Sequence, residues 1–154
     1  MTIPEQGRLC GIDYGTVRVG VAISDANQTM SAPHELLPRS TPEKEAAYFL
    51  KLVEHEQVRG FIVGLPLHIS GDESQKSQEA REYGAWLGKV SGVPIEFHDE
   101  RFTSSLAEDL LMDAGLTNKR RKARRDKLAA HLILSGFLEM RAQDSREGEA
   151  PAEP

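Results

Sequence analysis

The sequence predicts an α/β fold: a mixed five-stranded sheet, made of three antiparallel strands followed by two parallel crossover strands, with helices on both faces. Two observations support this. The segment Leu9–Asp25 is apolar up to an aspartate, turns, and resumes with β-branched residues at strict alternation, which is typical of a β-hairpin. Farther along, two short apolar runs alternate with segments of helical period, which is typical of parallel strands joined by helices.

The antiparallel part is predicted from the hairpin and a weaker third strand. Alternation places four β-branched residues of the second hairpin strand on one face, namely Val17, Val19, Val21 and Ile23. The third strand is expected over Gln28–Leu37. Pro33 lies within it and lacks a backbone donor, so we expect this strand at an edge of the sheet or carrying a bulge.

The first crossover begins with a helix. Thr41 and Pro42 suit the N-cap and the first helical position, and the apolar spacing predicts an end near Glu56. The apolar run Val58–Leu65 suits a strand covered on both faces. The polar segment Leu67–Ser74 then predicts a loop that faces the substrate at the carboxyl end of that strand.

The remaining elements continue the alternation. In order, they are a helix with Ala80, Tyr83, Gly84, Leu87 and Val90 on one face, a strand over Val93–His98, a helix from Thr103 or Ser104 to Gly115, and a last helix from about Asp126 through Phe137. The expected order is therefore three strands, then helix, strand, helix, strand and two helices. No internal repeat is visible.

Length and composition indicate one globular domain over residues 1–140, followed by a disordered acidic tail over residues 141–154, which is rich in Pro, Ala, Gly and acids. No apolar run approaches the roughly 20 residues that a membrane span needs, and no signal peptide is visible at the start. We therefore expect a cytoplasmic protein without a membrane partner. The single cysteine, Cys10, lies in the first strand and indicates a buried structural thiol.

The charge is unevenly distributed. The whole chain carries −5, but Thr117–Lys127 holds seven basic residues and one acid, which is +6 and leaves −11 on the rest. A run of arginines can be merely a solvated surface. This run stands directly ahead of Asp126, so we expect it to bind the phosphates of a nucleic acid through Lys119, Arg120, Arg121, Lys122, Arg124 and Arg125.

Three carboxylates stand at the ends of predicted elements. Asp13 ends the first strand and Glu100 follows the last, and carboxyl ends of neighbouring parallel strands meet at one edge of a sheet. Asp126 shares a helical stripe with Ala129, Ala130, Ile133 and Phe137, so it should lie where the last helix packs on the sheet. Two simpler interpretations stay open. Asp13 can cap its turn, and Asp126 can be a first-turn acid that the helix dipole stabilises or a partner of nearby arginines.

Three clustered acids repel one another unless a cation lies among them. Carboxylate oxygens in this number suit Mg²⁺ or Mn²⁺, each of which also accepts phosphate oxygens. The five histidines are scattered and there is no cysteine cluster, so a zinc site is not indicated.

Four segments resemble the signature blocks of the YqgF/RuvX family, in order and with family-like spacing over about Arg8–Met140. They are GIDYGTVRVGVAISD, FIVGLPLHISGDES, FHDERFTS and RRDKLAAHLIL. Members have a ribonuclease H-like fold and are described as Holliday junction resolvases or as nucleases that mature the small-subunit ribosomal RNA precursor. The resemblance thus implies a ribonuclease H-like mixed sheet and a metal-dependent nuclease.

The resemblance also implies roles for particular residues. The motif acids fall on Asp13, Glu100 and Asp126, which would be the catalytic residues and would hold two Mg²⁺ or Mn²⁺ ions. The motif arginines fall on Arg18 and Arg101, and the hydroxyls after Asp-Glu-Arg on Thr103 and Ser104, all expected to contact nucleic acid. Two positions depart from the family pattern: Phe102 replaces a frequent leucine, and Lys127 follows the aspartate where an uncharged residue is common.

The substrate expected from the resemblance is structured nucleic acid, either the 5′ end of pre-16S ribosomal RNA or a Holliday junction, on which two copies would act as a homodimer. Two other functions stay open. A non-catalytic module could bind nucleic acid through the basic segment alone. An actin-like ATP-binding domain also carries Asp-x-Gly-Thr after a strand, although such proteins enclose ATP between two domains and this chain has the length of one.

Overall fold

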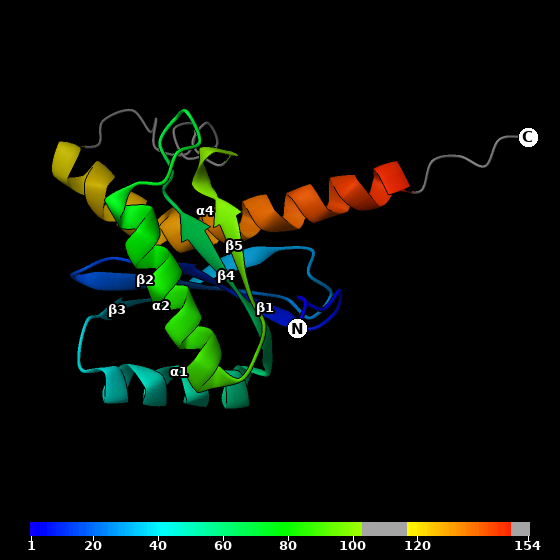
Figure 1. The fold of residues 1–154 in the computed structure, drawn as a ribbon, viewed down its shortest axis with the longest axis horizontal. Coiled ribbons are helices and arrows are strands. Elements are labelled where there is room, and N and C mark those ends of the chain that lie inside the picture. The colour runs from blue at the N-terminus through cyan, green and yellow to red at the C-terminus, as the bar shows by residue number, and fades with distance from the viewer. Residues whose placement is uncertain (103–116, 149–154) are drawn as a thin grey trace, which may run out of the picture.

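The computed structural model describes residues 1–102 and 117–148. Its centre is a five-stranded sheet in the order β3-β2-β1-β4-β5 (Figure 1). The strands are β1 (Arg8–Asp13), β2 (Arg18–Ser24), β3 (Ser31–Pro38), β4 (Val58–Leu65) and β5 (Ile95–Asp99). β2 is antiparallel to β1 and β3, whereas β4 is parallel to β1 and β5. The predicted mixed sheet is confirmed, and β1 lies at its middle.

The third strand has the irregularity that its proline predicts. β3 lies at the edge of the sheet, and its register against β2 shifts between Val21, opposite Glu35, and Ala22, opposite Pro33. His34 is therefore the extra residue of a bulge. Pro33, which cannot donate a backbone hydrogen bond, sits beside that bulge, as expected.

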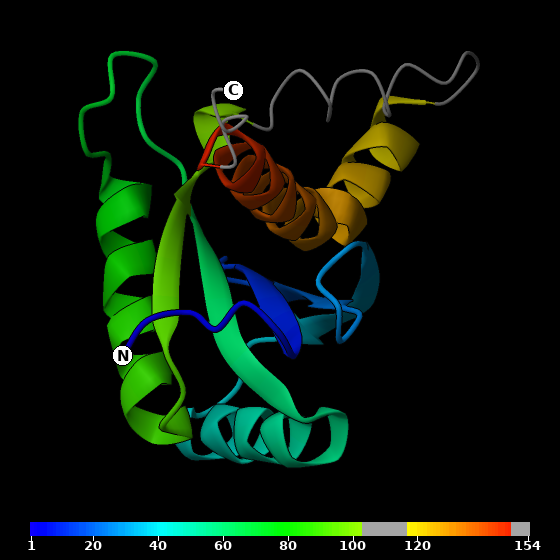
Figure 2. The ribbon, with the colours of Figure 1, turned by 90° about the vertical axis from the view of Figure 1, so that its right-hand side faces the viewer.

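Helices cover both faces of the sheet (Figure 2). α1 (Pro42–Glu56) and α2 (Gln75–Ser91) pack on one face, and α4 (Asn118–Gly148) packs on the other. β4 is buried on both sides, because Phe61 and Val63 belong to the core beneath α1 and α2 whereas Ile62 belongs to the core beneath α4. No helix within residues 1–102 and 117–148 has both the length and the apolar character that crossing a bilayer requires.

The beginnings of α1 and α2 follow local capping chemistry. Thr41 accepts a hydrogen bond from the backbone N–H of Lys44, with Pro42 at the first helical position, as the sequence predicts. α2 starts with a reciprocal capping box between Ser74 and Ser77. The Ser74 hydroxyl also donates to the carbonyl of Pro66 at 2.7 Å, which fastens the beginning of α2 to the end of β4.

The last helix is longer than predicted at both ends. It begins at Asn118 rather than near Asp126, so the basic segment forms its first two turns. Lysine and arginine favour helices, and the apolar period marks only the part that packs on the sheet. The tail, expected to be disordered from residue 141, is helical as far as Gly148. Arg141 anchors it by donating to the carbonyl of Pro4 and to Oε1 of Gln28, at 3.0 and 3.1 Å.

Two other expectations are not decided. The helix predicted up to Gly115, together with Thr103 and Ser104 at its start, lies outside the described residues. The domain limit at residue 140 stays a prediction. Glu100, directly after β5, begins a single 3₁₀ turn, η1 (Glu100–Phe102).

Glycines let α4 lie unusually close to the sheet. A Cβ atom at Gly11 would stand 2.7 Å from the carbonyl oxygen of Ala130 and 2.8 Å from Cβ of Leu134. A Cβ atom at Gly20 would stand 3.4 Å from Cβ of Ala130. The missing side chain at Gly11 permits this approach, which brings the turn of α4 that carries Asp126 to the carboxyl end of β1.

Candidate active site

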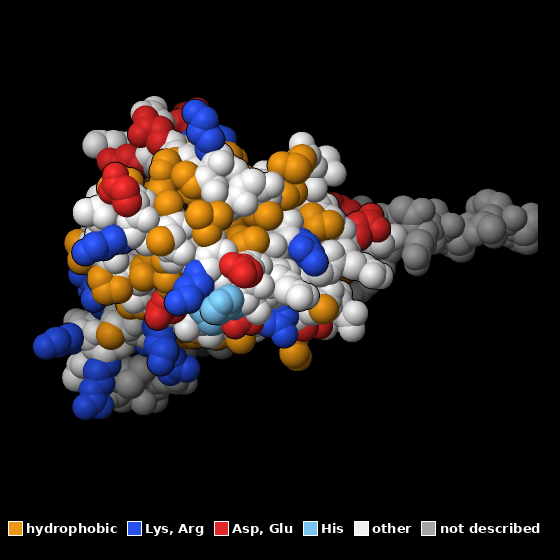
Figure 3. Space-filling model, turned by 90° about the horizontal axis from the view of Figure 1, so that it is seen from below, with side chains coloured by type: hydrophobic (Ala, Val, Ile, Leu, Met, Phe, Trp, Pro, Cys, Tyr) orange, Lys and Arg blue, Asp and Glu red, His pale blue; other side chains and the backbone are white. Residues whose placement is uncertain are grey.

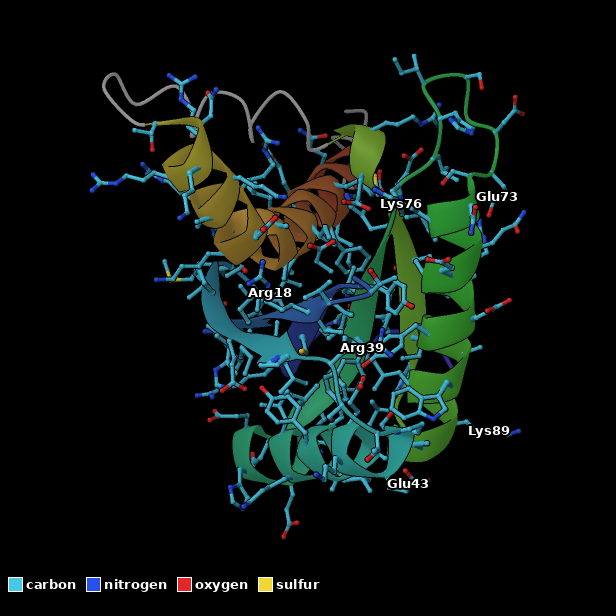
Figure 4. The ribbon with its side chains drawn as sticks, turned by 90° about the vertical axis from the view of Figure 1, so that its left-hand side faces the viewer. Arg18, Arg39, Glu43, Glu73, Lys76 and Lys89 are labelled. Carbon is cyan, nitrogen blue, oxygen red and sulfur yellow. The ribbon has the colours of Figure 1, made fainter. Side chains whose placement is uncertain are left out.

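A cleft of about 470 Å³ opens at the carboxyl edge of β1 and β4. Asp13 from β1, Glu100 from η1 and Asp126 from α4 all line it, so the structure brings together the three acids that the sequence singles out. Basic side chains also enter it, with Arg18 coming from β2 and Lys76 from the first turn of α2 (Figure 4). Its other lining residues are Tyr14, Gly15, Thr16, Val17, Gly20, Leu36, Pro66, Glu79 and Lys122.

Asp13 is a partly buried acid at the end of the central strand. It is the last residue of β1, opposite Gly20 on β2, and a Cβ atom at Gly20 would stand 3.3 Å from Cβ of Asp13. Burial raises the pKa of Asp13 to about 6, with a further increase from the charge of Asp126 and an opposing decrease from Lys76. The cost of ionising Asp13 in the fold indicates a carboxylate that lacks a full counter-charge.

Glu100 approaches the same edge from the end of β5. Its carboxyl carbon would stand 3.1 Å from a Cβ atom at Gly64, so the glycine of β4 makes room for this side chain. Burial raises the pKa of Glu100 to about 7, and the charges of Asp13 and Asp99 add to the increase while Lys76 opposes it. The charge of Asp13 therefore disfavours the ionisation of Glu100.

Asp126 lies at the more open side of the cleft and faces a cation. Its Oδ2 is 3.5 Å from Nη2 of Arg18, and both side chains are partly exposed. The proposed arginine partner of Asp126 is thus found on β2 rather than within the basic segment of α4. The charge of Asp126 also acts on Asp13, which indicates that the two carboxylates are neighbours across the α4–β1 contact.

The donor set suits a divalent cation with hard oxygen ligands. Asp13 and Glu100 are crowded carboxylates with raised pKa values, and an added positive charge would favour the ionised form of both. Among residues 1–102 and 117–148, however, no three side chains of metal-binding types are grouped closely enough to hold one ion. The three acids that line the cleft would have to move closer together to share one ion.

The turn after β1 is held by a buried network. Glu45, which is 2% exposed, accepts hydrogen bonds from the Tyr83 hydroxyl at 2.7 Å and from Nε of Arg39 at 3.1 Å. Arg39 also donates to the carbonyl of Gly15 at 3.0 Å and lies over the ring of Tyr14. The residues that line the cleft beside Asp13 are thereby fixed from the α1 side of the sheet.

The predicted nucleic-acid contacts occupy different places. On the first turns of α4, Lys122 lines the cleft, Arg121 and Arg124 are half-buried, and Lys119, Arg120 and Arg125 are exposed. Figure 3 shows the blue side chains of this projecting end gathered at the lower left. Arg101 instead ties the loop after β4 to the end of β5, because it binds the Asp99 carboxylate and donates to the carbonyl of Ile69 at 3.1 Å.

Lys76 and Glu79 are cleft residues that the sequence analysis missed. A signal for Lys76 exists. It stands in the first turn of α2, which contains no acid, although the positive end of the helix dipole disfavours a cation there by about 0.3–1 kcal/mol. A lysine placed against the dipole, just after the loop that follows β4, can be noticed in the sequence. Glu79, one turn later, gives no such signal.

The raised pKa values predict a pH-dependent stability of the metal-free protein. The folded-state pKa of Asp13, about 6, exceeds the ordinary 3.8, so its contribution to the free energy of unfolding is fully present below pH 3.8 and is lost as the pH rises through 6. Glu100, with about 7 against 4.5, acts in the same direction over a slightly higher window. In the presence of a chelator, we expect the Tm to fall between about pH 5 and about pH 8.

The Asp13→Asn variant isolates this effect. Its Tm should fall less over the same range, leaving it more stable than the wild type at the alkaline end by on the order of 2 kcal/mol. Thermal unfolding of both proteins checks this, with Asp144→Asn, a change at an exposed residue of α4, as the control. Parallel curves for the wild type and Asp13→Asn would contradict the assignment.

The fold and the cleft define the class of protein. A central β1 ending in a carboxylate, flanked by antiparallel β2 and parallel β4, is the ribonuclease H-like arrangement. The chain superposes on Thermus thermophilus RuvC, solved in complex with a Holliday junction substrate, with a TM-score of 0.52 and 13% identity, covering 86% of this chain and 95% of that one. The predicted ribonuclease H-like fold is confirmed.

The chain belongs to the RuvX family, described as Holliday junction resolvase, whose model matches residues 7–140. Two relatives bear the name "Putative pre-16S rRNA nuclease". The one from Rhodopirellula baltica is 46% identical over 88% of this chain and 79% of its own length. The one from Koribacter versatilis is 38% identical over 92% of each. The predicted class, a nuclease that hydrolyses phosphodiester bonds, is confirmed, and the ATP-binding and non-catalytic alternatives are not favoured.

Proposed function

We propose that this chain cuts structured nucleic acid at the cleft between β1, η1 and α4, with Asp13, Glu100 and Asp126 as its catalytic residues. The observation that carries the proposal is the convergence of these three acids, from three elements distant in sequence, beside the basic first turns of α4. Carboxylates alone would repel a phosphodiester. The adjoining lysines and arginines supply the positive charge that a nucleic acid needs in order to approach.

The proposed cofactor is Mg²⁺ or Mn²⁺, in two copies, held by Asp13, Glu100 and Asp126. Such ions, when bound, lower the pKa of a coordinated water and stabilise the charge on the leaving oxygen. The chain's own residues supply the oxygen ligands, and the network around Glu45 and Arg39 fixes the turn beside them. Arg18, whose Nη2 lies 3.5 Å from Oδ2 of Asp126, offsets the charge of that ligand.

The proposed contacts to the nucleic-acid backbone come from the beginning of α4. Lys122 enters the cleft, and the exposed side chains of the same turns extend the positive surface beyond it. Arg101 contributes by holding the loop over residues 67–74, since it donates to the carbonyl of Ile69. Contacts from Thr103 and Ser104 stay predictions from the family motif.

Two substrates are proposed. The names of the relatives favour the 5′ end of pre-16S ribosomal RNA, which would be processed during ribosome assembly in the cytoplasm. The family description favours a Holliday junction, on which two copies would have to act together to cut symmetrically. The same cleft would serve either substrate, because both present a phosphodiester to the carboxylates.

Cleavage assays on both substrates test the proposal. The purified protein is incubated with a four-way DNA junction and with a ribosomal RNA precursor, in Mg²⁺, in Mn²⁺ and in a chelator. We expect strand scission of at least one substrate that requires a divalent ion and is absent in the chelator. Scission that persists in the chelator, or no scission of either substrate with either ion, would refute the proposed function.

A further inference from the structure

Lys76 is held at a fixed place in the cleft. It is the second residue of α2, whose beginning is closed by the capping box of Ser74 and Ser77. The Ser74 hydroxyl is bonded to the carbonyl of Pro66, directly after β4. β4 is in turn paired with β1, which carries Asp13. The backbone of Lys76 is therefore positioned relative to the acids by hydrogen bonds, and Figure 4 places this residue at the end of α2 nearest the cleft.

Lys76 shares the cleft with the acids but is not paired with them. Lys76 lines the same cleft as Asp13 and Glu100, and its side chain is exposed. It nevertheless forms no ion pair within 4 Å with any residue of the described ranges, whereas Arg18 is paired with Asp126. Of these two cations, Lys76 is the one whose donors are available to an incoming anion.

The position of Lys76 does not serve the stability of α2. A cation in the first turn is disfavoured by the helix dipole, and the side chain is exposed, so it contributes little packing. The same helix carries Lys89 in its last turn, where the dipole favours a cation. The two lysines lie on the same helix and have the same side chain, but Lys76 lines the cleft with the acids and Lys89 does not. Lys89 is therefore a matched control.

We propose that Lys76 binds a non-bridging oxygen of the phosphate at which the strand is cut, from the side of the cleft opposite α4. This inference rests on the proposed nuclease function and deepens it. An ammonium group there would offset the repulsion between the phosphate and the two carboxylates. It would also stabilise the negative charge that grows on the phosphate oxygens when water attacks the phosphorus and the bond to the sugar oxygen breaks.

The test measures binding without cleavage. A labelled four-way DNA junction is titrated with protein in a chelator, from about 50 to about 200 mM KCl, and log K is plotted against log salt. One phosphate contact contributes about 0.9 to the slope, so Lys76→Ala should have a slope shallower by about that amount. Lys76→Arg, which keeps the charge, and Lys89→Ala should both keep the wild-type slope.

A second measurement follows the reaction. Under saturating protein and with Mn²⁺, Lys76→Ala should cut at least about 10-fold more slowly, since the lost contact is stronger in the transition state. Lys76→Arg should recover most of that rate. A Tm within a few degrees of the wild type excludes a folding defect, and Lys76→Gln provides a second neutral variant.

The outcomes separate this inference from the function on which it rests. If the wild type cuts with a divalent ion but Lys76→Ala keeps both its slope and its rate, Lys76 is not a phosphate ligand and the nuclease assignment stands. If the wild type shows no ion-dependent scission on either substrate, the proposed function and the role of Lys76 both fail.

Discussion

Replacing Asp13 with asparagine is expected to abolish cleavage while leaving the fold and nucleic-acid binding intact. Asparagine has nearly the same size, so the packing around Gly20 and Ala130 can be retained. It removes the buried negative charge, which costs free energy in the metal-free fold, so the variant should be at least as stable as the wild type at neutral pH. The rate should fall by at least about 10³-fold, which corresponds to about 4 kcal/mol of lost transition-state stabilisation.

Three measurements on Asp13→Asn separate chemistry from structure. Single-turnover cleavage gives the rate, titration in a chelator gives the affinity for the substrate, and thermal unfolding gives the stability. The affinity should be unchanged or slightly higher, because one negative charge near the phosphate is gone. Asp144→Asn, on the exposed end of α4, should behave as the wild type in all three. Cleavage by Asp13→Asn at the wild-type rate would refute the role of this acid.

Replacing Gly11 with valine is expected to damage both stability and activity. A Cβ atom at this position would stand 2.7 Å from a backbone oxygen of α4 and 2.8 Å from a Cβ atom, so no flexible side-chain end can move aside. The helix must shift away from the sheet, at a cost of about 3 kcal/mol. Because Asp126 lies one turn before Ala130 on that helix, a displacement of about 1 Å at the carboxylate should slow cleavage by about 100-fold.

Gly20→Ala provides a graded comparison for Gly11→Val. Its added Cβ would meet Cβ of Asp13 and of Ala130 at 3.3 and 3.4 Å, which a small local adjustment can relieve. We expect denaturant unfolding and cleavage assays to rank the proteins as wild type, Gly20→Ala and Gly11→Val in decreasing order. A Gly11→Val protein that is as stable and as active as the wild type would show that the close contact does not position Asp126.

The sheet could be predicted because its signals are local. Alternation in β2, the apolar run of β4 and Pro33 in β3 each act within a few residues. The extent of α4 could not, since its basic first turns and its last turns carry no apolar stripe, and the anchoring of Arg141 on Pro4 joins the two ends of the described chain. Hydrophobic period marks only the turns of a helix that pack.

The site shows the same division between local and long-range signals. Each acid could be selected because it stands at the end of an element, and the order of the strands then brings those ends to one edge. The partners of the arginines could not be selected in this way. Arg18 pairs with Asp126, which is more than a hundred positions away, and Arg101 holds Ile69 in a different loop. Such pairings depend on side-chain directions that only the packed structure defines.

The helix α4 sets the spacing between Lys122, a proposed phosphate contact, and Asp126, a proposed catalytic acid. Lys122 and Asp126 are one turn apart on the same helix, which fixes their separation at about 6 Å along its axis. A strand seated against Lys122 would thus present the same bond to the acids every time, whatever its bases. One residue inserted between these two positions would change their relative orientation around the axis by about 100°, whereas an insertion after Arg141 would leave it unchanged.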